Sequence, residues 1–190
     1  MIERRAAIKR LLEKRPRDMF IVPGLGSTTW DLASLGEDDR DFYLWGAMGG
    51  AAMIGLGLAL AQPDKRVVVI TGDGEMLMGL GSLATIGVKR PANLAVIVFD
   101  NGVYGETGMQ PSHTQKGVDL VAAARACGFA QCFDVADEAA VDALAAQLAG
   151  YNEMLFARVK IAADDPPRVL PERDGEVLKQ RFRRAVGAAP

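Results

Sequence analysis

The sequence has few of the residues that bind zinc or form disulfide bonds. It contains one histidine, His113, and two cysteines, Cys127 and Cys132, which are not spaced as a CxxC pair. A zinc centre needs several Cys or His ligands at short, regular spacings, so these three residues argue against one. We expect both cysteines to be reduced residues in the core of a cytoplasmic protein.

The sequence also lacks long runs of positive charge and long apolar segments. Its net charge is −2 and no basic cluster lies in the body of the chain, so we expect neither nucleic acid nor a membrane as a partner. Residues 1–18 are charged and amphipathic, and Glu3 and Glu13 favour a surface helix over a transit peptide. The longest apolar run, residues 46–61, is rich in glycine and shorter than the roughly 20 residues of a membrane span, which favours a buried helix.

The chain does contain an alternation of apolar strands and helices. Continuous apolar segments predict strands at residues 19–22, 66–71, 93–100 and 153–161. Periodicity and composition predict helices at residues 3–14, 29–35, 47–62, 76–90, 118–128 and 137–150. Strands that are apolar throughout and separated by helices indicate an α/β fold, a doubly wound parallel sheet with helices on both faces. We expect this domain at residues 1–165 and a Pro-rich, charged arm with a final helix at residues 166–190.

Two of the strands are followed by loops that combine glycine with a carboxylate. Residues 71–76 read TGDGEM and place Asp73 between two glycines, and the strand at 93–100 leads into DNG. Glycines let backbone N–H groups approach phosphate oxygens, and a carboxylate beside a phosphate requires a bridging cation. Mg²⁺ fits because it binds a few protein oxygens together with phosphate oxygens. Either loop alone is typical of an ordinary turn, but their pairing at neighbouring strand ends favours a Mg²⁺–phosphate site.

The combination of GDG with a following strand and Asn101 resembles the signature of thiamine diphosphate (ThDP)-dependent enzymes. The family usually has two asparagines at this point, so Asp100 departs from the pattern while Asn101 keeps the metal-binding position. The resemblance implies ThDP and Mg²⁺ as cofactors. It implies three metal ligands, namely the side chains of Asp73 and Asn101 and the main-chain oxygen of Val103. It places four further residues of these loops at the cofactor: Gly72, Gly74, Tyr104 and Gly105.

The segment WGAMGG at residues 45–50 resembles the part of the decarboxylases in this family that holds the aminopyrimidine ring. The resemblance implies that the carbonyl of Gly46 accepts a hydrogen bond from the 4′-amino group. It also implies that Met48 props the cofactor in its bent form, which makes Met48 a candidate catalytic residue. Judged by its type alone, a methionine in an apolar run is usually core filler.

The loop PGLGSTT at residues 23–29 resembles the family's first diphosphate contact. The contact would use the N–H of Gly26 and the hydroxyls of Ser27 and Thr28. A glycine-rich turn with Ser or Thr as a helix N-cap has the same composition, so this alternative stays open. Glu75 replaces the small or hydroxyl residue that commonly follows GDG, and we expect only its backbone N–H to contact phosphate.

The sequence lacks the other half of such an active site. In the family, a Glu on a separate pyrimidine-binding domain activates ThDP, and the similar segments here cover only residues 20–165. The resemblance therefore implies the β subunit of a split enzyme, in a hetero-oligomer with an α subunit that carries that domain and Glu. The loop DNGVYGETG, Gln110 after it, and the tail from RVLP to RFRR are most similar to sulfopyruvate decarboxylase β subunits and phosphonopyruvate decarboxylase. Those enzymes act on small 2-oxo acids with an anionic group on C3.

The residues after the metal ligands are candidates for substrate contacts: Tyr104, Glu106, Thr107, Gln110 and His113. His113 is a candidate catalytic proton carrier, although a single histidine on a polar loop is also typical of a solvated surface. Three alternatives stay open: an acetolactate-synthase-like carboligase, a 2-oxoacid oxidoreductase β subunit, and a non-catalytic nucleotide-binding α/β module. The scattered cysteines argue against the second, and Asn101 together with WGAMGG argues against the third.

Overall fold

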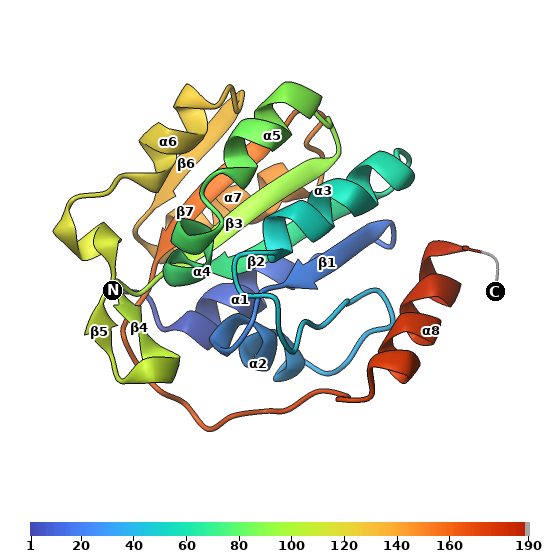
Figure 1. Cartoon of the computed structure of the whole chain (residues 1–190), viewed down its shortest axis with the longest axis horizontal. Coiled ribbons are helices and arrows are strands. Elements are labelled where there is room, and N and C mark those ends of the chain that lie inside the picture. Colours follow the sequence, from blue (N-terminus) through green and yellow to red (C-terminus); the bar gives the residue numbers. More distant parts are fainter. Residues whose placement is uncertain (189–190) are drawn as a thin grey trace.

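The computed structural model describes residues 1–188 and is built around one central sheet (Figure 1). Five strands run parallel in the order β1-β2-β3-β7-β6. They are β1 (Met19–Pro23), β2 (Arg66–Gly72), β3 (Leu94–Asp100), β7 (Leu155–Lys160) and β6 (Gln131–Val135). Most residues of the first four are buried, as expected for strands covered on both faces. The four predicted strands are confirmed.

Helices cover both faces of the sheet, which confirms the doubly wound α/β fold. One apolar core lies against α1 (Arg4–Leu12), α2 (Ser27–Ala33) and α7 (Glu138–Leu148), and it also includes Leu178 near the C-terminus. The opposite core lies against four: α3 (Ala51–Ala61), α4 (Asp73–Met78), α5 (Ser82–Lys89) and α6 (Leu120–Ala126). Alternate residues of β2 face the two cores, with Val68 and Ile70 in the first and Val67 and Val69 in the second. Within residues 1–188, none of the helices combines the length and apolar character needed to cross a membrane.

Two helices differ from the sequence-based expectation, and both differences involve the turn at residues 45–50. The helix predicted at 47–62 begins only at Ala51, because Ala47 and Gly49 have φ angles of 61° and 85°, outside the right-handed helical region. The helix predicted at 76–90 is divided into α4 and α5 around Gly79. A Cβ on Gly79 would lie 2.2 Å from the carbonyl oxygen of Gly49, so this glycine lets α4 end directly against the turn.

The sequence does not predict strand β6 or the small hairpin after β3. Strand β6, with the sequence QCFDV, is mostly only partly buried and lies at the edge of the sheet, so it lacks a continuous apolar run. The hairpin consists of β4 (Val103–Tyr104) and β5 (Gln110–Pro111). Cys127 and Cys132 are free thiols at the margin of the second core, half-buried rather than fully buried as predicted.

After β7 the chain continues as an extended segment, the C-terminal strap (residues 162–174), which leads into α8 (Gly175–Val186). In Figure 1 the strap runs past α2 along one edge of the molecule before α8 begins. Phe182 of α8 packs against Phe20 and Phe42, with ring centroids 5.7 and 5.0 Å apart. The predicted final helix is confirmed. The division into a domain at 1–165 and an arm at 166–190 stays a prediction.

Candidate active site

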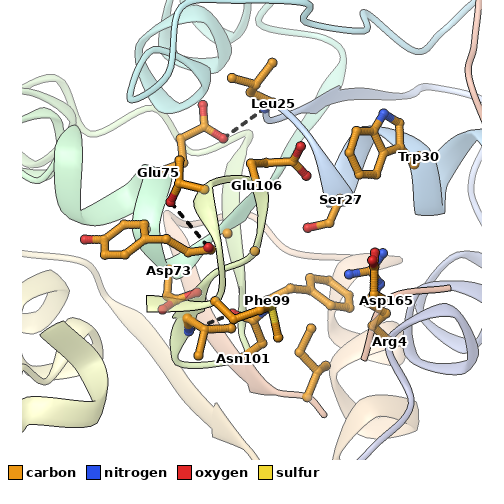
Figure 2. A pocket seen from close by; sticks show the side chains of 18 of the residues that line it. Arg4, Leu25, Ser27, Trp30, Asp73, Glu75, Phe99, Asn101, Glu106 and Asp165 are labelled. Atoms are coloured by element: carbon orange, nitrogen blue, oxygen red, sulfur yellow. Dashed lines mark hydrogen bonds between the residues drawn. The ribbon is translucent and has the colours of Figure 1, made fainter. Parts of the chain in front are cut away.

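A cavity of about 260 Å³ lies at the carboxyl ends of β1, β2, β3 and β7 (Figure 2). The segments that follow β1, β2 and β3 form most of its wall, within residues 25–30, 72–75 and 99–109. Helix α1 and the C-terminal strap close the remaining side through Arg4, Asp164, Asp165 and Arg168. This edge of a parallel sheet is where doubly wound α/β proteins bind their ligands.

Asp73 is the most buried charged residue of this cavity, with 2% of its surface exposed. Its Oδ2 accepts a hydrogen bond from the Ser112 hydroxyl. The Thr114 hydroxyl lies 3.2 Å from the same oxygen and 2.8 Å from Oδ1 of Asp100, between the two carboxylates. Burial, with a smaller effect of the negative charge on Asp100, raises the pKa of Asp73 to about 6 against these hydroxyl donors. Within residues 1–188, no Lys or Arg forms an ion pair with Asp73.

The loop after β3 gives Asp100 and Asn101 different positions. Oδ1 of Asp100 accepts the backbone N–H of Gly102 at 3.0 Å, and Oδ1 of Asn101 accepts that of Val103 at 3.0 Å. Asn101 and Val103 line the cavity, whereas Asp100 is buried and does not. The departure from the family's paired asparagines therefore falls on the residue outside the cavity wall.

Asp73, Asn101 and Val103 bring carboxylate, amide and main-chain oxygens to the same cavity. Hard oxygen donors suit Mg²⁺, which completes its octahedral shell with phosphate or water oxygens. Among residues 1–188, no three His, Cys, Asp or Glu residues are grouped as a softer transition metal would require. The chemistry of these donors thus fits Mg²⁺, while their roles as its ligands stay a prediction.

Glu75 directs its side chain into the protein. Its Oε2 accepts hydrogen bonds from the backbone N–H of Leu25 at 3.1 Å and from the Thr71 hydroxyl at 2.8 Å. Burial raises the pKa of Glu75, against these donors and the nearby N–H groups of Ala51 and Gly49. The carboxylate therefore lies where the loops after β1 and β2 and the 45–50 turn meet. Sequence reasoning missed this role, and the signal for it was the unusual acidic residue after GDG.

Two glycines are required by close packing around these loops. A Cβ on Gly24 would lie 1.8 Å from Oε2 of Glu75, within the hydrogen-bonded carboxylate. A Cβ on Gly74 would lie 2.5 Å from the ring of Tyr104, which crosses directly over the GDG turn. Only glycine permits both approaches without displacing the neighbouring side chain.

Most of the predicted cofactor residues line the cavity: Ser27, Met48, Gly72, Asp73, Gly74, Glu75, Asn101, Val103, Tyr104 and Gly105. Gly26, Thr28 and Gly46 do not, and the Thr28 hydroxyl instead donates to the carbonyl of Gly24 at 3.0 Å. The binding roles of all these residues stay predictions.

Among the candidate substrate residues, Tyr104, Glu106 and Thr107 line the cavity, whereas Gln110 and His113 do not. His113 is exposed on a 3₁₀ turn, His113–Lys116, beside the loop that supplies the Ser112 hydroxyl. The His113 side chain does not line the cavity, and its catalytic role stays a prediction.

Met48 lies at the cavity with 42% of its surface exposed, so it is not a core residue of this chain. It belongs to the 45–50 turn, whose positive φ angles hold it outside helix α3. An exposed apolar side chain at the rim of a cavity is a candidate contact for a ligand or another subunit.

Sequence reasoning missed the wall of the cavity that comes from distant parts of the chain. Arg4, Trp30, Asp164, Asp165 and Arg168 all line it. These residues have no motif in common, and only the packing of α1 and the C-terminal strap against α2 brings them together.

The sequence is similar to known proteins over the segments that form most of the cavity wall. Residues 26–159 match the model of the family "Thiamine pyrophosphate enzyme, C-terminal TPP binding domain". The chain is 49% identical over 124 residues to phosphonopyruvate decarboxylase of Streptomyces viridochromogenes, covering 65% of this chain and 31% of that protein. It is 35% identical over 189 residues to sulfopyruvate decarboxylase subunit beta of Methanothermobacter thermautotrophicus, covering 100% of this chain and 98% of that subunit.

The chain thus spans about a third of the length of the phosphonopyruvate decarboxylases and nearly all of that beta subunit. Among solved structures, a thiamin diphosphate-dependent enzyme from Mycobacterium smegmatis, described as putative, has a TM-score of 0.70 at 20% identity. The alignment covers 86% of this chain and 32% of that one, and at this identity it supports the fold alone. The fold, the family match and the paired GDG and Asn loops agree: the chain belongs to the thiamine pyrophosphate enzymes and corresponds to their C-terminal TPP-binding domain.

Proposed function

We propose that this chain is the β subunit of a split ThDP-dependent decarboxylase that acts on a 2-oxo acid with an anionic group on C3. The observation that carries the proposal is the meeting of Asp73, Asn101 and Val103 with Met48 in one cavity. The nearly full-length similarity to a protein named as a beta subunit supports the division into two chains.

In this proposal the oxygens of Asp73, Asn101 and Val103 hold Mg²⁺, which neutralises the diphosphate. Backbone N–H groups at residues 72–75 and the loop at 26–28 bind the diphosphate oxygens, and the carbonyl of Gly46 orients the aminopyrimidine. When bound, ThDP supplies a carbon nucleophile for the ketone and accepts electrons as CO₂ leaves. The protein contributes orientation and a site from which water is excluded, with Met48 as the apolar support.

The pyrimidine-binding domain and the activating Glu come from an α subunit in this proposal. Large apolar residues exposed near the 45–50 turn support an interface there: Trp45, Met48, Met53 and Met78 are 37%, 42%, 41% and 69% exposed. Such side chains on neighbouring segments are typical of a surface that a partner covers. We propose a hetero-oligomer in the cytoplasm, with the cofactor between the two kinds of subunit.

The experiment that tests this function is reconstitution. The chain is mixed with an α subunit that carries a pyrimidine-binding domain from the same organism, together with ThDP and Mg²⁺. We expect CO₂ release from sulfopyruvate or phosphonopyruvate to exceed that from pyruvate. Formation of a ligation product without aldehyde would instead favour the acetolactate-synthase-like alternative, and no turnover of any 2-oxo acid would contradict the proposal.

A further inference from the structure

One part of the cavity wall has no role in holding the cofactor as proposed above. It is formed by α1, α2 and the C-terminal strap, and it lies largely outside residues 26–159, which match the family. Within the described chain, the only positively charged residues that line the cavity are Arg4 and Arg168, both on this wall. A substrate with an additional anionic group needs such a charge, because the other charged side chains around the cavity are acidic.

Most of the Arg4 guanidinium is engaged in internal contacts, although its buried Nη2 has no hydrogen-bond partner among the described residues. Only 4% of it is exposed, and its Nε lies 2.8 Å from Oδ2 of Asp31. Its Nη1 donates to the carbonyl of Asp164 at 3.2 Å, which fastens the beginning of the strap. The guanidinium of Arg4 therefore has a structural use, because it compensates a buried carboxylate and orders the strap.

Arg168 is in the opposite situation. Its Cζ lies over the ring of Trp30, 4.3 Å from the ring centroid, and its side chain is 57% exposed. Its nearest acidic partner is Glu106, with Nη2 and Oε2 3.7 Å apart, which is beyond hydrogen-bond distance. No hydrogen bond joins this guanidinium to any other group within residues 1–188. Stacking on an aromatic face fixes the plane of an arginine while leaving the N–H groups at its edge free.

We propose that Arg168 binds the anionic C3 substituent of the substrate and so determines the specificity of the site. The inference rests on the proposed function and names the residue that selects its substrate class. The planar fork of Arg168 suits two oxygens of a sulfonate or phosphonate, a chemistry the two groups share. The carboxylates of Glu106 and Asp165 also line the cavity and oppose an anion, so the contact requires a guanidinium, and of the two that line the cavity Arg168 has the exposed one.

The test uses the reconstituted complex with ThDP and Mg²⁺ and compares Arg168→Gln and Arg168→Lys with the wild type. For sulfopyruvate and phosphonopyruvate we expect Arg168→Gln to raise KM by about 10- to 100-fold with little change in kcat, because a charge-assisted contact is lost. For pyruvate, which has no such group, KM should stay unchanged. Arg168→Lys should recover part of the loss, since it keeps the charge but not the fork.

A matched control is Arg173→Gln. Arg173 lies on the same strap and also faces a tryptophan, with its guanidinium 5.4 Å from the Trp45 ring, but it does not line the cavity. We expect this variant to keep the KM of the wild type for all three acids. If Arg173→Gln raised the KM for sulfopyruvate as much as Arg168→Gln does, the effect would come from a disturbed strap conformation and not from a contact between Arg168 and the substrate.

A binding measurement separates this inference from the proposed function. Sulfoacetate has the anionic group but no ketone, and calorimetry on the loaded complex should detect its binding to the wild type and a loss of about tenfold or more in Arg168→Gln. If the wild type decarboxylates no 2-oxo acid, the proposed function fails whatever sulfoacetate does. If the wild type prefers sulfopyruvate and Arg168→Gln keeps both that preference and the affinity for sulfoacetate, only the role of Arg168 is wrong.

Discussion

Oε2 of Glu75 accepts a hydrogen bond from the backbone N–H of Leu25 at 3.1 Å, and this contact joins the first turn of α4 to the loop after β1. The Thr71 hydroxyl donates to the same oxygen at 2.8 Å. A buried carboxylate is costly unless it accepts hydrogen bonds, and here Oε2 accepts two, whereas Oε1 has no hydrogen-bond partner within residues 1–188. The side chain thus fixes the relative position of segments that the sequence assigns to one cofactor.

Replacing Glu75 should loosen these loops. Glu75→Ala leaves the N–H of Leu25 and the Thr71 hydroxyl without their acceptor, so we expect a loss of about 1–3 kcal/mol in the free energy of unfolding and weaker ThDP binding. Glu75→Gln keeps an acceptor oxygen and should lose less of both. Urea unfolding and calorimetry measure the two effects. An alanine variant as stable as the wild type would contradict the role of the carboxylate in holding the loops.

Asp73→Asn should separate metal binding from folding. The amide keeps an oxygen for the Ser112 and Thr114 hydroxyls but removes the charge that a divalent cation needs. We expect the folded variant to lose the joint binding of Mg²⁺ and ThDP. Calorimetry of the complex with and without EDTA measures this. Equal affinity of the wild type for ThDP in the two conditions would rule out a bridging metal.

Met48 provides a test of cofactor geometry. Because it is 42% exposed, Met48→Ala should unfold at a free energy close to that of the wild type. If the side chain props the bent cofactor, the alanine variant should bind ThDP yet exchange its C2 proton about a hundredfold more slowly, whereas Met48→Leu should exchange it normally. NMR of cofactor-saturated complexes follows the exchange. Exchange at the wild-type rate in Met48→Ala would exclude this role.

The isolated chain should be catalytically silent, since the activating Glu is expected on the α subunit. Adding that subunit should raise both the affinity for ThDP and the thermal stability. The reason is that ThDP and the α subunit each bind tightly only to the folded chain when the other is present. Decarboxylation assays and thermal melts at several subunit ratios test this. A chain that alone decarboxylates 2-oxo acids at the rate of the mixture would show that no partner is needed.

Asp41 should make stability depend on pH away from the active site. It is 1% exposed and pairs with Nη1 of Arg15 at 2.7 Å, and burial raises its pKa from 3.8 to about 6 despite this cation. Because the folded protein then binds the proton more tightly than the unfolded chain, the free energy of unfolding should fall as pH rises from about 4 to 6, by at most about 3 kcal/mol. Urea unfolding at several pH values measures the slope.

The matched variant for this prediction is Asp41→Asn, which cannot titrate. The difference in unfolding free energy between it and the wild type should vary with pH between about 4 and 6 and be constant above that range. Comparing the two variants cancels other titrating groups, including Asp73. A difference that is the same at every pH would mean that the folded pKa of Asp41 is not raised.

Local sequence was sufficient for four of the five strands of the sheet and for one edge of the cavity. The apolar runs of β2 and β3 are buried on both faces, so their composition predicts parallel strands directly. The polar residues after such strands must meet, because carboxyl ends of parallel strands share one edge of the sheet. The sequence alone therefore pairs Asp73 with Asn101.

Long-range packing decided the rest. The edge strand β6 is only partly buried and has no strong pattern, and the start of α3 depends on a turn that α4 contacts through Gly79. The direction of the Glu75 side chain depends on the N–H of Leu25, from a different loop. Arg168 reaches the cavity because the strap passes α2, and there the Arg168 guanidinium lies over the ring of Trp30. These contacts join segments far apart in the chain, so their free energy is not encoded in the pattern of either segment alone.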